Sequence, residues 1–381
     1  MTHSLTREEL LRRAVAGGVV LAIPGLGPAV ASAAPGATPK LGKTLTISTW
    51  PFYIDVDDKT KKRPTLEQFE KRYGVKVKYI EDVNDNDGFF GKIQAQLRRG
   101  QSIGRDIIVM TDNSPYPTLM VKNGWLEKLD QSALPNIKNL QDSLRNPSWD
   151  PKGEYGLPWQ SFLTGIAYNL KQTKTPVTTI ERLLTDKRLH GKVTMLNQIP
   201  DSIGLVMLEN GDDPAHVTDA SFRRAFERIQ KAVKSGQIRK FTGNDYTGPL
   251  ARGDLAACVS WSGDVAQLTL ENKNLKWVVP KDGGIIATDY MLIPRKGDAY
   301  TASVFMNYYY DPRVAAKLAA YLYYPTPVKG VAGVLAKTDP RAAKSPLIFP
   351  TAGMRKQLHV FDSRVAFNTG YKKEWQKLLG A

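Results

Sequence analysis

Aromatic and acidic residues of the kind that bind organic cations stand at positions where loops are expected. Trp-Pro-Phe-Tyr occupies 50–53, and Gly-Gly-Ile-Ile-Ala-Thr-Asp occupies 283–289. Between and beyond these stretches lie Tyr116, Asp201, Trp261 and Tyr324. Ring faces attract cations, and carboxylates form charge-assisted hydrogen bonds with ammonium groups. The pattern therefore indicates a binding protein for an organic cation.

Residues for catalysis do not come together in the sequence. The histidines stand in no zinc or triad spacing. Cys258, the only cysteine, cannot form an intrachain disulfide, and Leu-Ala-Ala-Cys-Val-Ser-Trp at 255–261 is typical of a buried strand. We predict that the protein is not an enzyme and has no catalytic residue, metal site or cofactor. An exported hydrolase is the alternative from another class.

The first residues have the order of an export signal. Arg12 and Arg13 precede an apolar run at 14–30, and Ala-Ser-Ala at 31–33 offers a cleavage site. The adjacent arginines suggest twin-arginine export, and the prolines and glycines of the run disfavour a transmembrane anchor. We predict a signal peptide at 1–33, a linker at 34–42, and an exported protein that is periplasmic or extracellular and associated with the cell surface.

The formal charge of +16 could indicate nucleic-acid binding. The lysines and arginines are spread along the chain, however, without a basic arm, zinc spacing or recognition-helix signature. We therefore predict no nucleic-acid partner and interpret the excess as a solvated surface.

Alternating strands and helices are expected to position the site residues. Hydrophobic periodicity and the helix-ending Gly74 predict a βαβαβ unit with a parallel sheet. Its elements are a strand at 44–49, a helix at 65–73, a strand at 75–80, a helix at 87–99 and a strand at 106–110.

The later chain has a second α/β unit and then a return. Two extended crossing segments are expected at 155–159 and 165–169, and the second α/β unit at 178–280. A strand at 289–294 follows, and two helices within 302–323 are separated at Asp311-Pro312.

Ordered motifs over nearly the whole mature chain resemble those of the spermidine/putrescine-binding proteins. These are the extracellular substrate-binding subunits of ABC importers with the type II periplasmic-binding fold. The matching motifs are Trp-Pro-Phe-Tyr at 50–53, Tyr-Gly-Leu-Pro at 155–158, Trp-Ser-Gly at 261–263, Val-Pro-Lys-Asp-Gly-Gly at 279–284 and Tyr-Pro-Thr-Pro at 324–327. The resemblance implies two α/β lobes joined by crossing strands, with the ligand held in the cleft as the lobes close. The implied boundaries are 43–160 with 284–325 for lobe 1, and 161–283 with 326–381 for lobe 2.

The resemblance also implies the ligand-binding residues. Carried over position by position, they are Trp50, Tyr53, Tyr116, Gln198, Asp201, Trp261, Asp289 and Tyr324. Two positions depart from the family, since Gln198 replaces an acid and Ala287 replaces a stacking tryptophan. A carboxylate partner contributes roughly 1.5 to 3 kcal/mol and a ring face about 0.5 to 2, so a different amine is expected as ligand. Asp112 or Asp264 could replace the missing acid.

The resemblance implies capture of putrescine, spermidine or a related small amine for an ABC permease and its ATPase, by a monomer. A receptor of the same fold for an opine, a thiamine-like cation or a metal is the alternative. Individual residues also have structural alternatives. The tryptophans could be core packing, Asp201 could cap a helix, and Asp289 could cap a turn.

Overall fold

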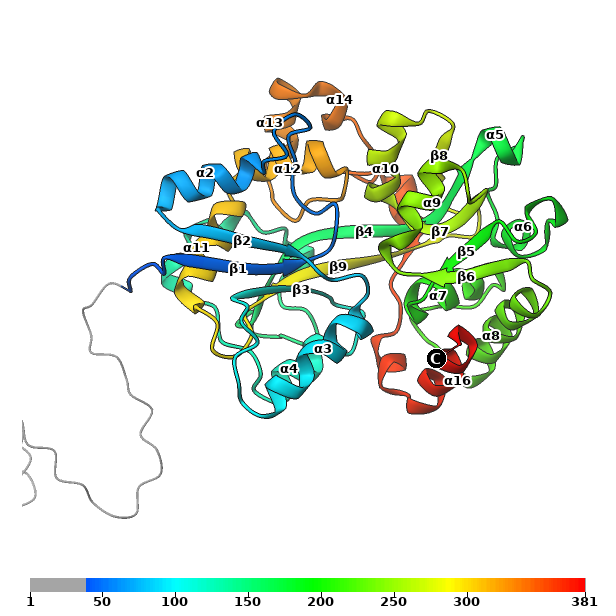
Figure 1. The fold of residues 1–381 in the computed structure, drawn as a ribbon, viewed down its shortest axis with the longest axis horizontal. Coiled ribbons are helices and arrows are strands. Elements are labelled where there is room, and N and C mark those ends of the chain that lie inside the picture. Colours follow the sequence, from blue (N-terminus) through cyan, green and yellow to red (C-terminus); the bar gives the residue numbers. More distant parts are fainter. Residues whose placement is uncertain (1–38, 381) are drawn as a thin grey trace, which may run out of the picture. The chain divides into compact units, whose positions relative to one another are not determined.

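One mixed sheet runs through the computed structural model, which describes residues 39–380 (Figure 1). Its strand order is β2-β1-β3-β9-β4-β7-β5-β6, with β10 beside β9 and β8 beside β4. The strands are β1 (Thr44–Thr49), β2 (Lys76–Glu81), β3 (Ile107–Thr111), β4 (Gly156–Asn169), β5 (Val193–Leu196), β6 (Ile238–Thr242), β7 (Ala257–Trp261), β8 (Leu275–Val278), β9 (Gly284–Leu292) and β10 (Leu358–His359).

The first three strands confirm the predicted βαβαβ unit. Strand β1 pairs in parallel with both β2 and β3. Helices α2 (Pro64–Tyr73) and α3 (Asn86–Arg98) make the crossovers, and α4 (Tyr116–Lys122) follows β3. Helix α2 ends where predicted, because Gly74 adopts a left-handed conformation at φ 69° and its N–H donates to the carbonyl of Glu70.

The long strands β4 and β9 pair antiparallel and lie between the two groups of parallel strands (Figure 1). All residues of β4 are buried, and the two predicted crossing segments are parts of this one strand. Strand β9 begins at Gly284, so the predicted start at 289 was wrong. The strand begins earlier because its residues from Ile285 to Asp289 pair with β4.

The second group of parallel strands is β7, β5 and β6, in that order. Cys258 is fully buried in β7, as predicted. Helix α8 buries Phe222, Phe226 and Ile229 and begins with a capping box between Thr218 and Ser221. The helices of this part are α5 (Leu170–Thr173), α6 (Ile180–Thr185), α7 (Ile199–Glu209), α8 (Asp219–Lys234), α9 (Thr247–Arg252) and α10 (Ser262–Glu271).

After β9 the chain returns to the first group of strands. Helices α11 (Ala299–Tyr309) and α12 (Pro312–Leu322) are separated at Asp311-Pro312, as predicted. Proline suits the first helical turn, where its missing N–H costs nothing. The remaining helices are α13 (Val331–Thr338), α14 (Pro340–Ala343), α15 (Ala352–Lys356) and α16 (Thr369–Leu379).

We call the elements around β1 to β3, with α11 and α12, the first lobe, and those around β5 to β7 the second lobe. The two-lobed α/β architecture with crossing strands is the predicted fold class. The exact residue boundaries of the lobes stay a prediction, and the predicted signal peptide at 1–33 lies outside the described residues. Within 39–380, no helix is both long and apolar enough to cross a membrane.

Candidate functional site

A small cavity lies where the carboxyl ends of parallel strands from both lobes meet. Trp50 follows β1, Thr111 ends β3, and Trp261 ends β7. Side chains at such strand ends converge on the crevice that binds ligands in open α/β sheets. The complete lining is Trp50, Tyr53, Thr111, Phe162, Gln198, Asn244, Trp261 and Asp289. The volume is about 10 Å³, close to the least that one water molecule needs, so the walls must move apart to admit an organic ligand.

Half of the residues that line the cavity are aromatic. The rings of Trp50 and Trp261 meet edge to face with centroids 5.6 Å apart, and Phe162 meets Trp261 at 6.0 Å. The indole N–H groups of both tryptophans are buried, and neither forms a hydrogen bond of normal geometry within the described residues. The N–H of Trp261 is directed closely enough at Asp201 to oppose the rise in the pKa of that carboxyl group. These rings and donors surround a space that carries no lysine, arginine or histidine in its lining.

Asp289 is the carboxylate of the cavity wall. It is 1 % exposed and lies in the middle of β9, so it does not cap a turn. The hydroxyl of Thr111 donates to Oδ1 at 2.7 Å, and the hydroxyl of Tyr53 donates to Oδ2. Burial raises the pKa of Asp289 to about 7; the two hydroxyls oppose this shift, and the charges of Asp112 and Asp201 reinforce it.

Two further buried carboxylates lie next to the cavity. Asp201 accepts a hydrogen bond of 2.5 Å from the hydroxyl of Thr164. Asp264 accepts hydrogen bonds from Asn244 Nδ2 at 2.6 Å and from the hydroxyls of Tyr246 and Tyr324 at 2.8 and 2.5 Å. Burial raises the pKa of each carboxyl group to about 6 despite these donors. In the part of the chain that the structure describes, neither of them, nor Asp289, forms an ion pair.

The two lobes are in contact beside the cavity. Asn86 Nδ2 of the first lobe donates to Gln198 Oε1 of the second lobe at 2.6 Å. The backbone N–H of Asn244 donates to the carbonyl oxygen of Asn84 at 3.2 Å. At Gly243 this approach leaves no room for a side chain, because a Cβ atom would lie 2.3 Å from the carbonyl oxygen of Asn84.

Comparison with known proteins identifies the family. The family of bacterial extracellular solute-binding proteins matches residues 65–348. The chain belongs to this family. Because this match covers most of the chain, it confirms the family predicted from the ordered motifs. The members are the solute-binding proteins of ABC transporters, and solute-binding proteins are not enzymes.

Several relatives of this solute-binding protein match over most of their length. Spermidine/putrescine-binding periplasmic protein 1 of Haemophilus influenzae is 26 % identical, over 91 % of both chains. The putrescine-binding periplasmic protein PotF of Escherichia coli is 27 % identical, over 83 % of this chain and 85 % of its own. The solved structure of a putative spermidine/putrescine ABC transporter from Listeria monocytogenes is 25 % identical and covers 89 % of this chain and 98 % of its own, with a TM-score of 0.73.

The predicted site residues of the solute-binding protein fall into three groups. Trp50, Tyr53, Gln198, Trp261 and Asp289 line the cavity. Tyr324 lies behind the wall, with its ring centroid 5.5 Å from that of Tyr53, and Asp201 is likewise buried outside the lining. Tyr116 is not part of the lining, since its ring stacks on Phe90 at 4.2 Å and its hydroxyl donates to Asp87. The alternative of Asp201 as a helix cap is wrong, because Gln198 occupies the N-cap position of α7.

Three lining residues were not predicted, namely Thr111, Phe162 and Asn244. Phe162 lies opposite Ala287 in the pairing of β4 with β9. Directly opposed residues of paired strands share a face, so Phe162 places a ring beside the position where the expected tryptophan is absent. Thr111 could have been noticed as the residue directly after the predicted strand at 106–110, whereas no sequence signal distinguishes Asn244.

The two acids considered as replacements have other surroundings. Asp264 is held by the three donors described above. Asp112 accepts a hydrogen bond from the backbone N–H of Thr288 at 3.1 Å and lines a different hollow, with Trp149 and Tyr290. Neither carboxylate is in the cavity lining.

A Gly-Gln-Ser-Ile-Gly run at 100–104 has the spacing of a hydrolase nucleophile elbow. Such an elbow joins a strand to a following helix. Here the run joins α3 to the following β3, and Ser102 is exposed and accepts a hydrogen bond from the N–H of Gly104. This geometry does not support the hydrolase alternative.

The raised pKa values predict how stability without ligand depends on pH. At pH values between about 3.9, the pKa of an aspartate in the unfolded chain, and the raised pKa of Asp289, the folded protein binds more protons at this carboxyl group than the unfolded protein does. The free energy of unfolding therefore rises as the pH falls. The raised pKa values of Asp112, Asp201 and Asp264 act in the same direction.

We expect the thermal midpoint to rise on going from pH 8 to pH 5, by roughly 1–2 °C for each kcal/mol gained in a chain of this length. Calorimetry of the ligand-free protein measures it. The variant Asp289→Asn should show a smaller slope between pH 8 and pH 6. A thermal midpoint that falls steadily as the pH is lowered from 8 to 5 would contradict the burial of ionised carboxylates.

Proposed function

We propose that this protein is the exported receptor of an ABC importer and that it binds a small organic diamine such as putrescine between its lobes. The observation that carries the proposal is the buried Asp289 beside the rings of Trp50 and Trp261. A buried carboxylate without a cationic partner is costly, and a bound ammonium group supplies that partner. The rings add cation–π attraction. The relative from Haemophilus influenzae is a spermidine/putrescine-binding protein and that from Escherichia coli is a putrescine-binding protein, which supports the same ligand class.

Ligand entry requires the lobes to separate. The polar contacts between Asn86 and Gln198 and between Asn84 and Asn244 would break when the lobes separate and form again when they close. The ring contact of Trp50 with Trp261 and the hydrogen bond from Tyr324 to Asp264 would break and form again with them. The strands β4 and β9 connect the lobes and are the elements about which they would turn. When the lobes close on the ligand, water is excluded, and the attraction between ammonium and carboxylate strengthens.

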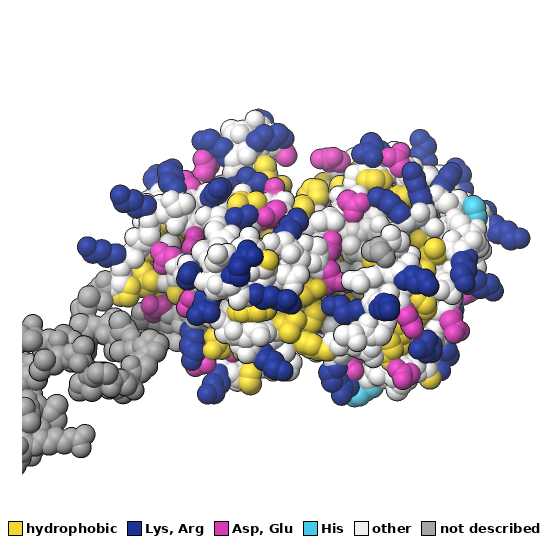
Figure 2. Space-filling view, turned by 60° about the horizontal axis from the view of Figure 1, so that its bottom comes forward, with side chains coloured by type: hydrophobic (Ala, Val, Ile, Leu, Met, Phe, Trp, Pro, Cys, Tyr) yellow, Lys and Arg dark blue, Asp and Glu magenta, His cyan; other side chains and the backbone are white. Residues whose placement is uncertain are grey.

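The other parts of the proposal rest on the resemblance to ABC importer receptors. The closed receptor delivers its ligand to a membrane permease that is driven by a cytosolic ATPase. It acts as a monomer outside the membrane, without catalysis, cofactor or bound metal. Figure 2 shows lysines and arginines distributed over the visible face without a single basic stripe, which agrees with an interpretation of the high charge as a solvated surface.

A cation of the protein itself favours a ligand with fewer charges. Lys372 of α16, in the second lobe, places Nζ 5.5 Å from the ring centroid of Tyr116, in the first lobe. Tyr116 is a position at which the resemblance implied a ligand contact, and the lysine already occupies its ring face. A third ammonium group directed toward Tyr116 would meet this like charge. We therefore propose preference for a diamine over the triamine spermidine.

Calorimetric titration with putrescine, spermidine, lysine and arginine tests the proposal. We expect putrescine to bind more tightly than spermidine. The variant Lys372→Gln should shift the ratio of the two affinities toward spermidine by severalfold. The control Lys373→Gln, at an exposed neighbouring position, should leave the ratio unchanged. Because the pKa of Asp289 is about 7, binding at pH 7 should release a fraction of a proton, measurable in buffers of different ionisation enthalpy. Failure of every amine to bind would refute the function, and stronger binding of spermidine would refute the preference.

A further inference from the structure

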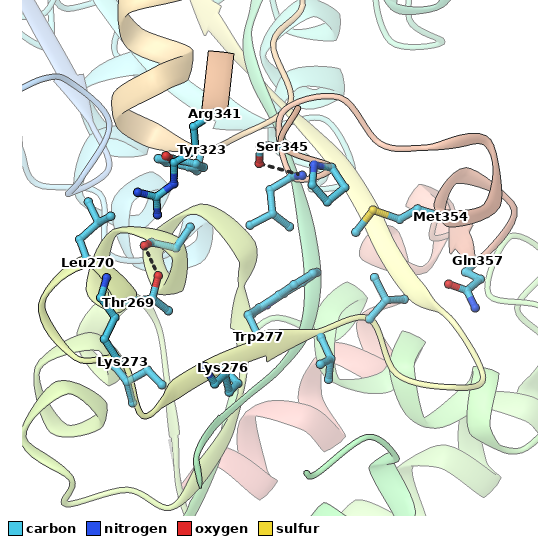
Figure 3. A pocket seen from close by; sticks show the side chains of 16 residues that line it. Thr269, Leu270, Lys273, Lys276, Trp277, Tyr323, Arg341, Ser345, Met354 and Gln357 are labelled. Carbon is cyan, nitrogen blue, oxygen red and sulfur yellow. Dashed lines mark hydrogen bonds between the residues drawn. The ribbon is translucent and has the colours of Figure 1, made fainter. Parts of the chain in front are cut away.

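Another hollow lies on the surface between α10, β8 and the segment from α14 to α15 (Figure 3). It is separate from the cavity lined by Trp50, Trp261 and Asp289, which we call the ring cavity. We call the surface hollow the α10 groove. Its volume is about 680 Å³, within the range of the clefts that bind small molecules in proteins. Trp277, Leu347 and Met354 are partly exposed in it, and Leu270 at its edge is 50 % exposed. Apolar side chains of this size are normally covered when they gather in a hollow.

The charged residues of the α10 groove are all positive. Lys273, Lys276 and Arg341 line it, and no aspartate or glutamate does. None of these cations forms an ion pair with any residue of the described range 39–380. In Figure 3, Lys273 and Arg341 lie at the same end as Leu270, whereas Met354 and the exposed Gln357 lie at the other end. The groove therefore combines a cationic end with an apolar floor.

The two sides of the α10 groove come from different lobes. Helix α10 and strand β8 belong to the second lobe. Tyr323 follows α12 of the first lobe, and Arg341 lies in α14, which packs with α13 against α12. We therefore count α13 and α14 with the first lobe, whereas the resemblance implied lobe 2 for residues 326–381. An occupant of the groove would contact both lobes at once, on a surface that does not share any lining residue with the ring cavity.

We propose that the α10 groove is a docking site for a segment of a partner protein that carries carboxylates next to leucine or aromatic side chains. The carboxylates pair with Lys273 and Arg341 at the cationic end, and the apolar side chains cover Leu270 and Trp277. Charge complementarity of this kind sets partner choice, and buried apolar contacts supply affinity. The exposed Gln357 offers hydrogen bonds to a peptide backbone. The hydroxyl of Thr269 donates to the carbonyl of Ala266 and can still accept, and that of Ser345 accepts from the N–H of Leu347 and can still donate. This inference does not depend on the identity of the amine ligand.

A labelled peptide in which glutamates flank leucine and phenylalanine is the probe, and its control has glutamine in place of each glutamate. Fluorescence anisotropy with the whole mature protein measures both. We expect the acidic peptide to bind at least tenfold more tightly than its control. The double variant Lys273→Gln/Arg341→Gln should weaken binding of the acidic peptide at least tenfold, and Leu270→Ser should weaken it severalfold.

The double variant Lys337→Gln/Lys344→Gln is the matched control, because it removes the same charge from exposed positions that do not line the groove. It should bind the peptide like the parent protein, and putrescine affinity should be unchanged in both double variants. If both double variants bind the acidic peptide equally weakly, the peptide is attracted by the net charge of the protein and not by the groove, and the proposal is overturned. Absence of peptide binding would also overturn it. Binding to phosphatidylglycerol vesicles that is lost only in the groove variant, without peptide binding, would instead assign the groove to a membrane surface.

Discussion

Replacing Asp289 by asparagine is expected to lower putrescine affinity roughly ten- to hundredfold without destabilising the ligand-free protein. The substitution removes the charge that pairs with an ammonium group but keeps the size of the side chain. Because burial raises the pKa of Asp289, removal of the charge relieves a desolvation cost in the free protein, so its thermal midpoint at pH 8 should stay equal or rise. Calorimetric titration and thermal unfolding of the same preparation measure both quantities.

Asp112→Asn is the matched control for this prediction. Burial also raises the pKa of Asp112, to about 6, but its side chain lines the hollow with Trp149 and Tyr290 rather than the ring cavity. Its loss should leave putrescine affinity within a few fold of the parent. Equal losses in the two variants would show a general electrostatic effect, and an unchanged affinity in Asp289→Asn would remove Asp289 from the site.

Gly243→Ala is expected to weaken ligand binding at least about tenfold, although residue 243 is not in the cavity lining. The new Cβ atom would lie 2.3 Å from the backbone carbonyl oxygen of Asn84, which belongs to the other lobe. A backbone atom cannot move aside as a flexible side chain can, so the lobes must separate. The apparent affinity then falls with the population of the closed form.

Small-angle scattering with and without putrescine, together with titration, measures this effect. Gly91→Ala is the control, since Gly91 lies within α3 and a Cβ atom there has no neighbour within 4 Å. That variant should bind like the parent and gain roughly 0.4–1 kcal/mol of stability. If Gly243→Ala binds putrescine as tightly as the parent and becomes equally compact with it, closure between Asn84 and Gly243 is not part of binding.

Much of the fold could be predicted from local patterns. Alternation of apolar residues in β1 and β2, and the apolar face of α2 ending at Gly74, depend on residues close in sequence. The predicted parallel pairing also followed, because strands joined by a crossover helix run in the same direction. The start of β9 was missed because its first residues become a strand through pairing with β4, more than a hundred residues earlier in the chain.

The sequence alone determined the family, the two α/β units and the residue types of the proposed cation site. Five residues chosen from it, Trp50, Tyr53, Gln198, Trp261 and Asp289, come together in one cavity lining. They do so because they lie near the crossing strands or at the carboxyl ends of parallel strands, positions that the βαβ pattern already implies.

Only the tertiary structure decided which other side chains share the cavity wall with these five residues. The register of β4 against β9 places Phe162 opposite Ala287, and a shift of one residue would turn Phe162 to the other face. The contact between lobes brings Asn244 to the wall and places Lys372 over Tyr116. These arrangements depend on pairing and packing between segments far apart in the chain, for which no local propensity exists.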